Sequence, residues 1–278
     1  MHEFKAACVQ MRSGRDVRAN LDACEALVRE AAHSGALYVQ TPEMTNVLER
    51  GREAQMAAVS LEAQDPFLAR MSDVARDLQI WLHLGSLAIK REDGKLANRG
   101  FLLAPDGGLA ARYDKIHMFD VDLPGGESWR ESETYEPGSV SPVVELPFTK
   151  VGMAICYDVR QPALFREQAK RGAQVLSAPA AFTRQTGRAH WHVLQRARAI
   201  ENGAFMISAA QGGTHEDGRE TYGHSMIVDP WGRVIAELDH DEPGVLVAEI
   251  RLKLAEDARA RVPAIANART FTVDEVAL

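Results

Sequence analysis

The sequence predicts an α/β fold in which mixed β-sheets are covered by helices. Two observations carry this prediction: strand-like and helix-like segments alternate along most of the 278 residues, and the chain closes with hairpins. No low-complexity tract, internal repeat or Pro-, Gly- or Ser-rich linker divides it. We therefore expect a single domain over residues 1–278, with a C-terminal tail at about 252–278. A layered α–β–β–α sandwich and a doubly wound sheet both fit the alternation.

Hydrophobic spacing defines the elements of the first half. Residues 4–11 read as a strand, and residues 16–34 carry apolar side chains at helical spacing before Gly35, a common helix stop. A strand over 36–43 and a helix over 66–78 follow. Three further strands are predicted at 80–89, 99–105 and 109–115, and the turn signal "EDGK" joins the first two of them in a hairpin. Residues 116–142 read as a long polar loop, and such loops in compact domains are usually functional.

The second half repeats the alternation. The predicted elements are strand, helix, strand, helix and strand, at 143–156, 161–171, 174–178, 189–201 and 204–210. A final hairpin over 222–238 turns at "DPWG", and another strand lies near 245–250. Because hairpins pair antiparallel strands while helices connect parallel ones, we expect mixed sheets.

Composition limits the function classes. The net charge is −7, and acidic and basic residues are interspersed, so we expect no nucleic-acid partner. No apolar run is long enough to span a bilayer and the N-terminus does not read as a signal peptide, so we expect no membrane partner. The three cysteines are odd in number and far apart: Cys8, Cys24 and Cys156. Together these features predict a cytoplasmic enzyme in a reducing setting.

Three residues with reactive side chains stand where predicted strands end. Glu43 follows "YVQTP", Lys115 follows "ARYD", and Cys156 follows "VGMAI". Each alone is weak, because a strand-end acid or lysine is usually solvated and a buried cysteine is usually a small core hydrophobe, as we read Cys8 and Cys24. Together they supply a base, a cation and a thiol nucleophile, the parts that an acyl-transfer site needs.

Five segments then occur in order between about residues 4 and 250: "TPEMTN", "YDKIHMFDVDLPG", "GMAICYDVR", "AHWHVLQRARAIENGAF" and "YGHSMIVDPWG". The chain in this respect resembles the nitrilase (carbon–nitrogen hydrolase) superfamily over nearly its whole length. The resemblance implies a four-layer α-β-β-α sandwich, a Glu–Lys–Cys catalytic set at Glu43, Lys115 and Cys156, and neither metal nor organic cofactor. It also implies a homodimer that extends the sandwich, or a higher homo-oligomer.

Each member of the set has a chemical role. Glu43 would take the thiol proton while Cys156 attacks an amide carbon, and Lys115 would stabilise the oxyanion together with the N–H of Tyr157. Ammonia would leave to give a thioester, which water activated by Glu43 would hydrolyse. In "LPGGESWRES" both Glu127 and Glu131 are candidates for a second carboxylate, and resemblance to related amidases favours Glu131.

Several residues are candidates for binding the substrate. Arg160 suits an anionic group, although an ion pair with Asp158 or Glu167 is an equal alternative. Phe182 and Thr186 fall where relatives line the acyl pocket. Four histidines were weighed as metal ligands: His117, His190, His192 and His224. "HWH" places two of them two residues apart, on different helix faces, and we find no cysteine or carboxylate to complete a set, so we expect no metal.

The resembling branch acts on deaminated glutathione and on ω-amides of 2-oxo acids. It implies hydrolysis of a terminal carboxamide of a small anionic acid, a small-molecule amide substrate, to carboxylate and ammonia. Hydrolysis of N-carbamoyl amino acids, aliphatic amides or nitriles is an alternative. A catalytically silent binding or scaffold relative is another, which the intact catalytic set disfavours. A thiol redox sensor would need a cysteine near Cys156, and none is near in sequence.

Overall fold

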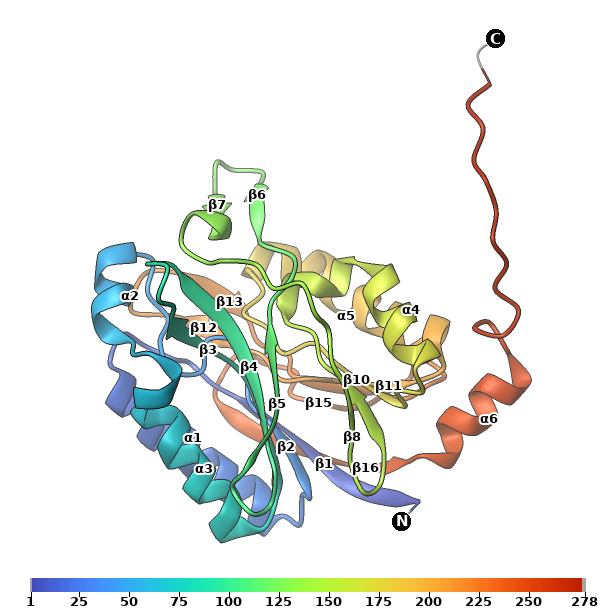
Figure 1. The fold of residues 1–278 in the computed structure, drawn as a ribbon, viewed down its shortest axis with the longest axis horizontal. Coiled ribbons are helices and arrows are strands. Elements are labelled where there is room, and N and C mark those ends of the chain that lie inside the picture. Colours follow the sequence, from blue (N-terminus) through green and yellow to red (C-terminus); the bar gives the residue numbers. More distant parts are fainter. Residues whose placement is uncertain (1, 277–278) are drawn as a thin grey trace.

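The computed structural model describes residues 2–276, which form two mixed six-stranded sheets packed face to face (Figure 1). The first sheet has the order β16-β1-β2-β3-β4-β5, with strands Gly244–Arg251, Glu3–Gln10, Tyr38–Gln40, Trp81–Lys90, Leu96–Leu103 and Leu109–Asp114. The second has the order β15-β14-β11-β10-β9-β8, with strands Val234–Glu237, Met226–Val228, Phe205–Ser208, Val175–Ser177, Lys150–Gly152 and Val143–Glu145.

Helices cover the outer face of each sheet, which completes four layers. The first sheet carries α1 (Val17–His33) and α3 (Pro66–Leu78), and the second carries α4 (Pro162–Lys170) and α5 (Arg184–Asn202) (Figure 1). Two further helices, α2 (Arg52–Ala58) and α6 (Lys253–Arg261), lie at the periphery. This is the predicted α-β-β-α sandwich, and the doubly wound alternative is excluded.

Alternation along β1 shows how the sequence specifies the layers. Ala6 and Cys8 join the core cluster that contains residues of the second sheet, whereas Ala7 and Val9 join the cluster that contains α1 and α3. Successive strand side chains point to opposite faces, so a continuous apolar strand is buried on both. Cys8 is thus a buried core residue, as predicted.

Capping residues fix the helices of the first half. Asp65 accepts a hydrogen bond from the N–H of Leu68, Pro66 occupies the first turn, and Gln79 ends α3 in the left-handed conformation. Each device satisfies or removes a backbone group that the helix end leaves unpaired. The prediction for 66–78 is confirmed to the residue, and Asp16 caps α1 in the same way.

The predicted strand over 143–156 is wrong. It is a short hairpin, β8 and β9, and residues 153–155 lead from it into a 3₁₀ turn, Cys156–Arg160. The reason is local: the segment between β8 and β9 contains Pro147, whose missing N–H cannot join a ladder.

Other boundaries also differ. Helix α5 begins at Arg184 rather than 189, because the hydroxyl of Thr183 caps it. The loop over 116–142 contains a hairpin, β6 (Asp120–Asp122) with β7 (Ser128–Arg130), and a 3₁₀ turn at Glu131–Glu133. Helix α2, the hairpin β12 (Gly212–Thr214) with β13 (Glu220–Tyr222), the 3₁₀ turn Glu62–Gln64 and α6 within the tail were not predicted. Among the described residues, no helix is both long and apolar enough to cross a membrane.

Candidate active site

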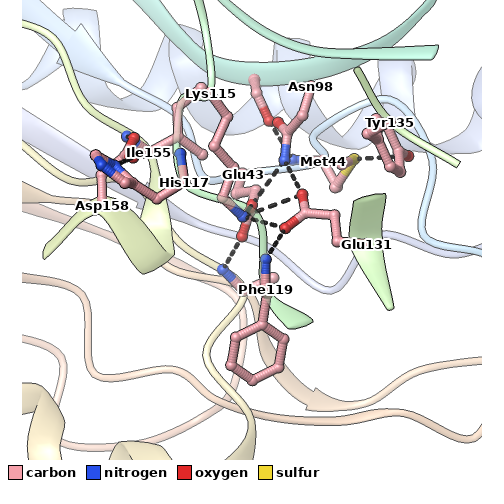
Figure 2. Close-up of polar contacts among 12 residues, drawn as sticks. Glu43, Met44, Asn98, Lys115, His117, Phe119, Glu131, Tyr135, Ile155 and Asp158 are labelled. Carbon is pink, nitrogen blue, oxygen red and sulfur yellow. Dashed lines mark hydrogen bonds and ion pairs between the residues drawn. The ribbon is translucent and has the colours of Figure 1, made fainter. Parts of the chain in front are cut away.

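A buried network of charged side chains occupies the end of the first sheet (Figure 2). The ammonium of Lys115 lies 2.9 Å from one oxygen of Glu43 and 2.8 Å from one of Glu131. The amide nitrogen of Asn98 donates to both carboxylates, at 2.9 Å each, and the N–H of Phe119 donates to Glu131 at 2.7 Å. The ammonium of Lys115 thus lies between the two carboxylates.

The strands of the first sheet bring these residues together. Glu43 follows β2, Asn98 lies on β4, and Lys115 directly follows β5, where its N–H bonds to the carbonyl of Asn98. A register shift in β3 between Leu84 and Leu87 makes room for the Glu43 loop. Gly85 is required there, because an added Cβ would stand 2.2 Å from the carbonyl oxygen of Thr41.

Cys156 reaches this network from the second sheet. It has a positive φ of 50°, a conformation that few non-glycine residues adopt, and its N–H bonds to the carbonyl of Pro179. Asp158, fully buried, accepts from the N–H of Ile155, from the Tyr113 hydroxyl and from the N–H of His117. These bonds hold the turn in a strained conformation, as is common at functional sites.

The environment sets the protonation states of the three groups. Burial raises the pKa of the Cys156 thiol well above its usual value, and the adjacent Glu43 carboxylate raises it further. Burial alone would raise the pKa of Glu43, but the charge of Lys115 and hydrogen bonds to Lys115 and Asn98 outweigh it and lower the pKa. For Lys115, the two carboxylates overcome burial and raise the pKa. The resting site thus holds a thiol, a carboxylate and an ammonium.

This arrangement suits a thiol that loses its proton during attack rather than before it. The second oxygen of Glu43 accepts from the N–H of Ala181 at 2.9 Å, which fixes the carboxylate plane. Among residues 2–276, no partner accepts from the N–H of Tyr157, directly after Cys156. A free N–H and an ammonium beside a nucleophile are the donors that an oxyanion needs.

A cavity of about 450 Å³ opens above the network, within the size range of small-molecule sites. The predicted residues Tyr157, Arg160, Phe182 and Thr186 all line it. The Arg160 guanidinium lies 5.3 Å from the ring centroid of Phe182, and among the described residues no carboxylate lies within 4.0 Å of it. Of the two alternatives for this residue, the ion pair with Asp158 or Glu167 is absent.

A second cationic part of the cavity was not predicted from the sequence. The guanidinium groups of Arg50 and Arg219 lie over the indole of Trp129, at 4.6 and 4.4 Å from its centroid. The side chain of Arg219 is 16% exposed, its Nε has no hydrogen-bond partner among residues 2–276, and a carboxylate oxygen of Asp217 lies 3.6 Å from its guanidinium. Arg50 has no carboxylate within 4.0 Å in the same range. No sequence signal marks these residues, because they come from two distant loops.

The two candidate acids of the long loop separate clearly. Glu131 contacts Lys115, as described above, whereas the carboxylate of Glu127 accepts from Trp129 Nε1 at 2.8 Å. Asn98 and Asp158 were also missed as site residues, because a single amide or acid between apolar residues has no distinctive sequence pattern.

Comparison with known proteins identifies the family. The carbon-nitrogen hydrolase family model matches residues 5–260. The chain belongs to this family. It is 40% identical over 268 residues to the deaminated glutathione amidase of Mus musculus, covering 95% of this chain and 82% of that protein. Relatives from a Synechocystis sp. and from Yersinia enterocolitica, 39% and 38% identical, are also named deaminated glutathione amidases.

Solved structures agree with the four-layer fold. The C. elegans NitFhit protein superposes with a TM-score of 0.89 at 36% identity, covering 97% of this chain and 66% of that longer chain. A glutamate-to-glutamine mutant of the Nesterenkonia sp. AN1 amidase superposes with a TM-score of 0.78 at 28% identity, covering 94% of this chain and 95% of that one. In that structure the acetamide moiety of fluoroacetamide is attached covalently to the active-site cysteine.

Proposed function

We propose that this carbon–nitrogen hydrolase cleaves an amide of a small anionic 2-oxo acid, of the deaminated glutathione or ω-amide type, through a thioester on Cys156. One observation carries the proposal: a buried Glu43–Lys115 ion pair meets the thiol at the base of a cavity that also contains uncompensated guanidinium groups. The ion pair supplies the base and the oxyanion donor, and the guanidinium groups supply recognition of an anionic substrate.

Acylation begins with the thiol. As the sulfur attacks the amide carbon, its proton passes to the carboxylate of Glu43, and the carbonyl oxygen becomes an oxyanion held by Lys115 and the N–H of Tyr157. Collapse of this intermediate breaks the C–N bond, and the leaving amine takes the proton from Glu43. The product is a thioester, with Glu43 again a carboxylate.

Deacylation uses the same groups in the same order. Glu43 takes a proton from water as the water oxygen attacks the thioester carbon, and Lys115 again holds the oxyanion. The C–S bond then breaks, and the sulfur recovers the proton from Glu43. Glu131 contributes by holding Lys115 beside the oxyanion, and Asn98 contributes by holding Glu43 in place.

The leaving amine depends on the substrate. An ω-amide of a 2-oxo acid releases ammonia, whereas the amides of glutathione lie within its chain, so a deaminated glutathione releases a dipeptide that carries its own carboxylate. Arg160 can bind one carboxylate, and the group formed by Arg50, Trp129 and Arg219 can bind a second. This second cationic group favours the larger, dianionic substrate.

The test is product release from matched substrates. Deaminated glutathione, 2-oxoglutaramate, an aliphatic amide, an N-carbamoyl amino acid and a nitrile are compared, with Cys156→Ala as the blank and both ammonia and amine measured. We expect the oxo-acid amides to react, and intact-protein mass spectrometry to find an acyl group on Cys156. Reaction of only carbamoyl, aliphatic or nitrile substrates, or activity that persists in Cys156→Ala, would contradict the proposal.

We infer in addition a homodimer in a cytoplasmic, reducing compartment. Apolar side chains are exposed on α5 and on the turn between β14 and β15: Val193 is 67% exposed, Ile200 54% and Trp231 53%. A second copy packed on this face would bury them and extend the sandwich, as the family resemblance implies. The three cysteines are free thiols, which a reducing compartment preserves. Sedimentation of the protein with Val193→Glu, expected to be monomeric, tests the dimer.

A further inference from the structure

Outside the active site, three metal-ligating side chains meet at the edge of the second sheet. His192 lies on α5, His224 lies just before β14, and Glu237 ends β15. Glu237 Oε1 is 2.7 Å from His192 Nε2 and 3.0 Å from His224 Nδ1. Ligand atoms of all three lie within 4.8 Å of one another. Two imidazoles and a carboxylate therefore converge on one point.

The sheet register explains this convergence. Met226 of β14 is paired with Glu237 of β15, so His224, two residues before Met226, is the diagonal neighbour of Glu237 on the same face. Helix α5 covers this face and contributes His192. His190 instead contacts Arg160, so the two histidines of "HWH" diverge as their spacing predicts. The carboxylate that completes the group comes from a strand far along the chain, which the sequence analysis did not consider.

His224 is held rigidly in place. Its backbone is left-handed, with φ of 56°, and its ring stacks on Tyr222 at a centroid distance of 4.1 Å. Its N–H bonds to the carbonyl of His240, and its carbonyl accepts from Trp191 Nε1 at 2.8 Å. A ligand with so little freedom loses little entropy on binding an ion.

We propose that His192, His224 and Glu237 bind a divalent transition-metal ion, with Zn²⁺ as the reference ion. Two histidines and one glutamate form a recognised zinc donor set that leaves a fourth position for water. Bonds of about 2.0–2.2 Å place tetrahedral donor atoms roughly 3.3–3.5 Å apart, so the present contacts need to widen by only about half an ångström. The ion replaces the hydrogens that now link each imidazole to the carboxylate, and each ring carries its proton on its other nitrogen.

The ion would tie α5 to the outer edge of the second sheet. β15 is the edge strand, and it is joined to the sheet only through β14. Binding would therefore stabilise the native state, by an amount that rises with the logarithm of the ion concentration above Kd, because the three ligands are separated in the unfolded chain. This role is independent of the amidase reaction and does not rest on the proposed function.

The experiment titrates Zn²⁺ into the full-length Cys156→Ala protein by calorimetry, because the active-site thiol and Glu43 could themselves bind zinc. One ion per chain is expected. Glu237→Gln, which keeps the side-chain shape, should weaken binding by at least about tenfold, since even loss of a residue that only orients a ligand can cost that much. His33→Gln, an exposed histidine at the end of α1, is the matched control and should leave the affinity unchanged.

A second measurement covers the possibility that Glu237→Gln folds poorly. Co²⁺ added to the Cys156→Ala protein should give the visible bands of tetrahedral nitrogen and oxygen ligation, and stoichiometric Zn²⁺ should remove them. No binding to the Cys156→Ala protein, or equal affinity in Glu237→Gln and His33→Gln, would overturn the proposal. So would a Co²⁺ complex without tetrahedral bands.

Discussion

Lys115→Met tests the catalytic network most directly. Methionine is close to lysine in length but carries no charge, so the change leaves the buried carboxylates of Glu43 and Glu131 facing each other with only Asn98 between them. Breaking a buried ion pair in this way costs about 3–5 kcal/mol of stability. Loss of one oxyanion donor lowers kcat on the order of 100- to 1,000-fold.

The stability loss should depend on pH in a defined direction. Two carboxylates in one buried site raise each other's pKa, so the folded variant takes up a proton that the unfolded chain lacks. A group whose folded pKa lies above its unfolded value stabilises the fold below the unfolded pKa, and this contribution disappears as pH rises through the folded pKa. The penalty of Lys115→Met should therefore shrink as pH falls, by about 1.4 kcal/mol per pH unit within that window.

The assay is urea unfolding at about pH 8 and about pH 5, with wild type measured at both. Lys95→Met is the matched control: Lys95 pairs with Glu136 at 2.8 Å, but both side chains are well exposed, so the expected cost is below about 1 kcal/mol at either pH. Equal penalties for Lys115→Met at the two pH values, or a penalty no larger than that of the control, would refute the account of the network.

Three further predictions follow from the site. Because the pKa of Glu43 is lowered and those of Cys156 and Lys115 are raised, kcat/KM should stay flat between about pH 5.5 and 8.5, and an inflection near neutrality would contradict base catalysis by Glu43. Arg50→Gln should raise KM for deaminated glutathione by about 10-fold or more but leave KM for 2-oxoglutaramate unchanged. An equal rise in KM for both substrates would contradict a second anion subsite at Arg50. Asp158→Asn should cost about 1–3 kcal/mol of stability and lower kcat, because the amide NH₂ of asparagine would face the N–H and O–H donors that the carboxylate now accepts from. Urea unfolding and single-turnover rates measure the two effects. An unchanged kcat would show that the turn keeps its conformation without the carboxylate.

Sequence patterns predicted the elements whose own residues carry the signal. Helix α3 begins and ends where its caps and apolar spacing require, and hairpin β14–β15 turns at the predicted tetrapeptide. The strand predicted over 143–156 failed because Pro147 interrupts the apolar run, so that the segment forms a hairpin instead of one continuous strand. The short hairpins β6–β7 and β12–β13 lie in polar stretches, where no periodicity marks them.

For the candidate site, the sequence indicated the reactive groups but not the contacts between them. Glu43, Lys115 and Cys156 stood out because a base, a cation and a thiol at strand ends are unusual in combination. Asn98, Asp158, Arg50 and Arg219 did not, because their importance comes from partners 33 or more residues away in the chain. Such partners are brought together only by sheet packing.

The proposed catalytic set is divided between the two sheets, and this ties the proposed chemistry to the core. Glu43 and Lys115 come from the first sheet, while Cys156 and the Ala181 N–H that holds Glu43 come from the second. Asp158 crosses the same boundary, because it bonds the Tyr113 hydroxyl of β5 as well as its own turn. A change in sheet packing therefore moves the nucleophile relative to its base, and an error of about 1 Å can cost on the order of 100-fold in rate. The tightly packed core between the sheets is thus part of the catalytic apparatus, since it fixes the one distance on which proton transfer depends.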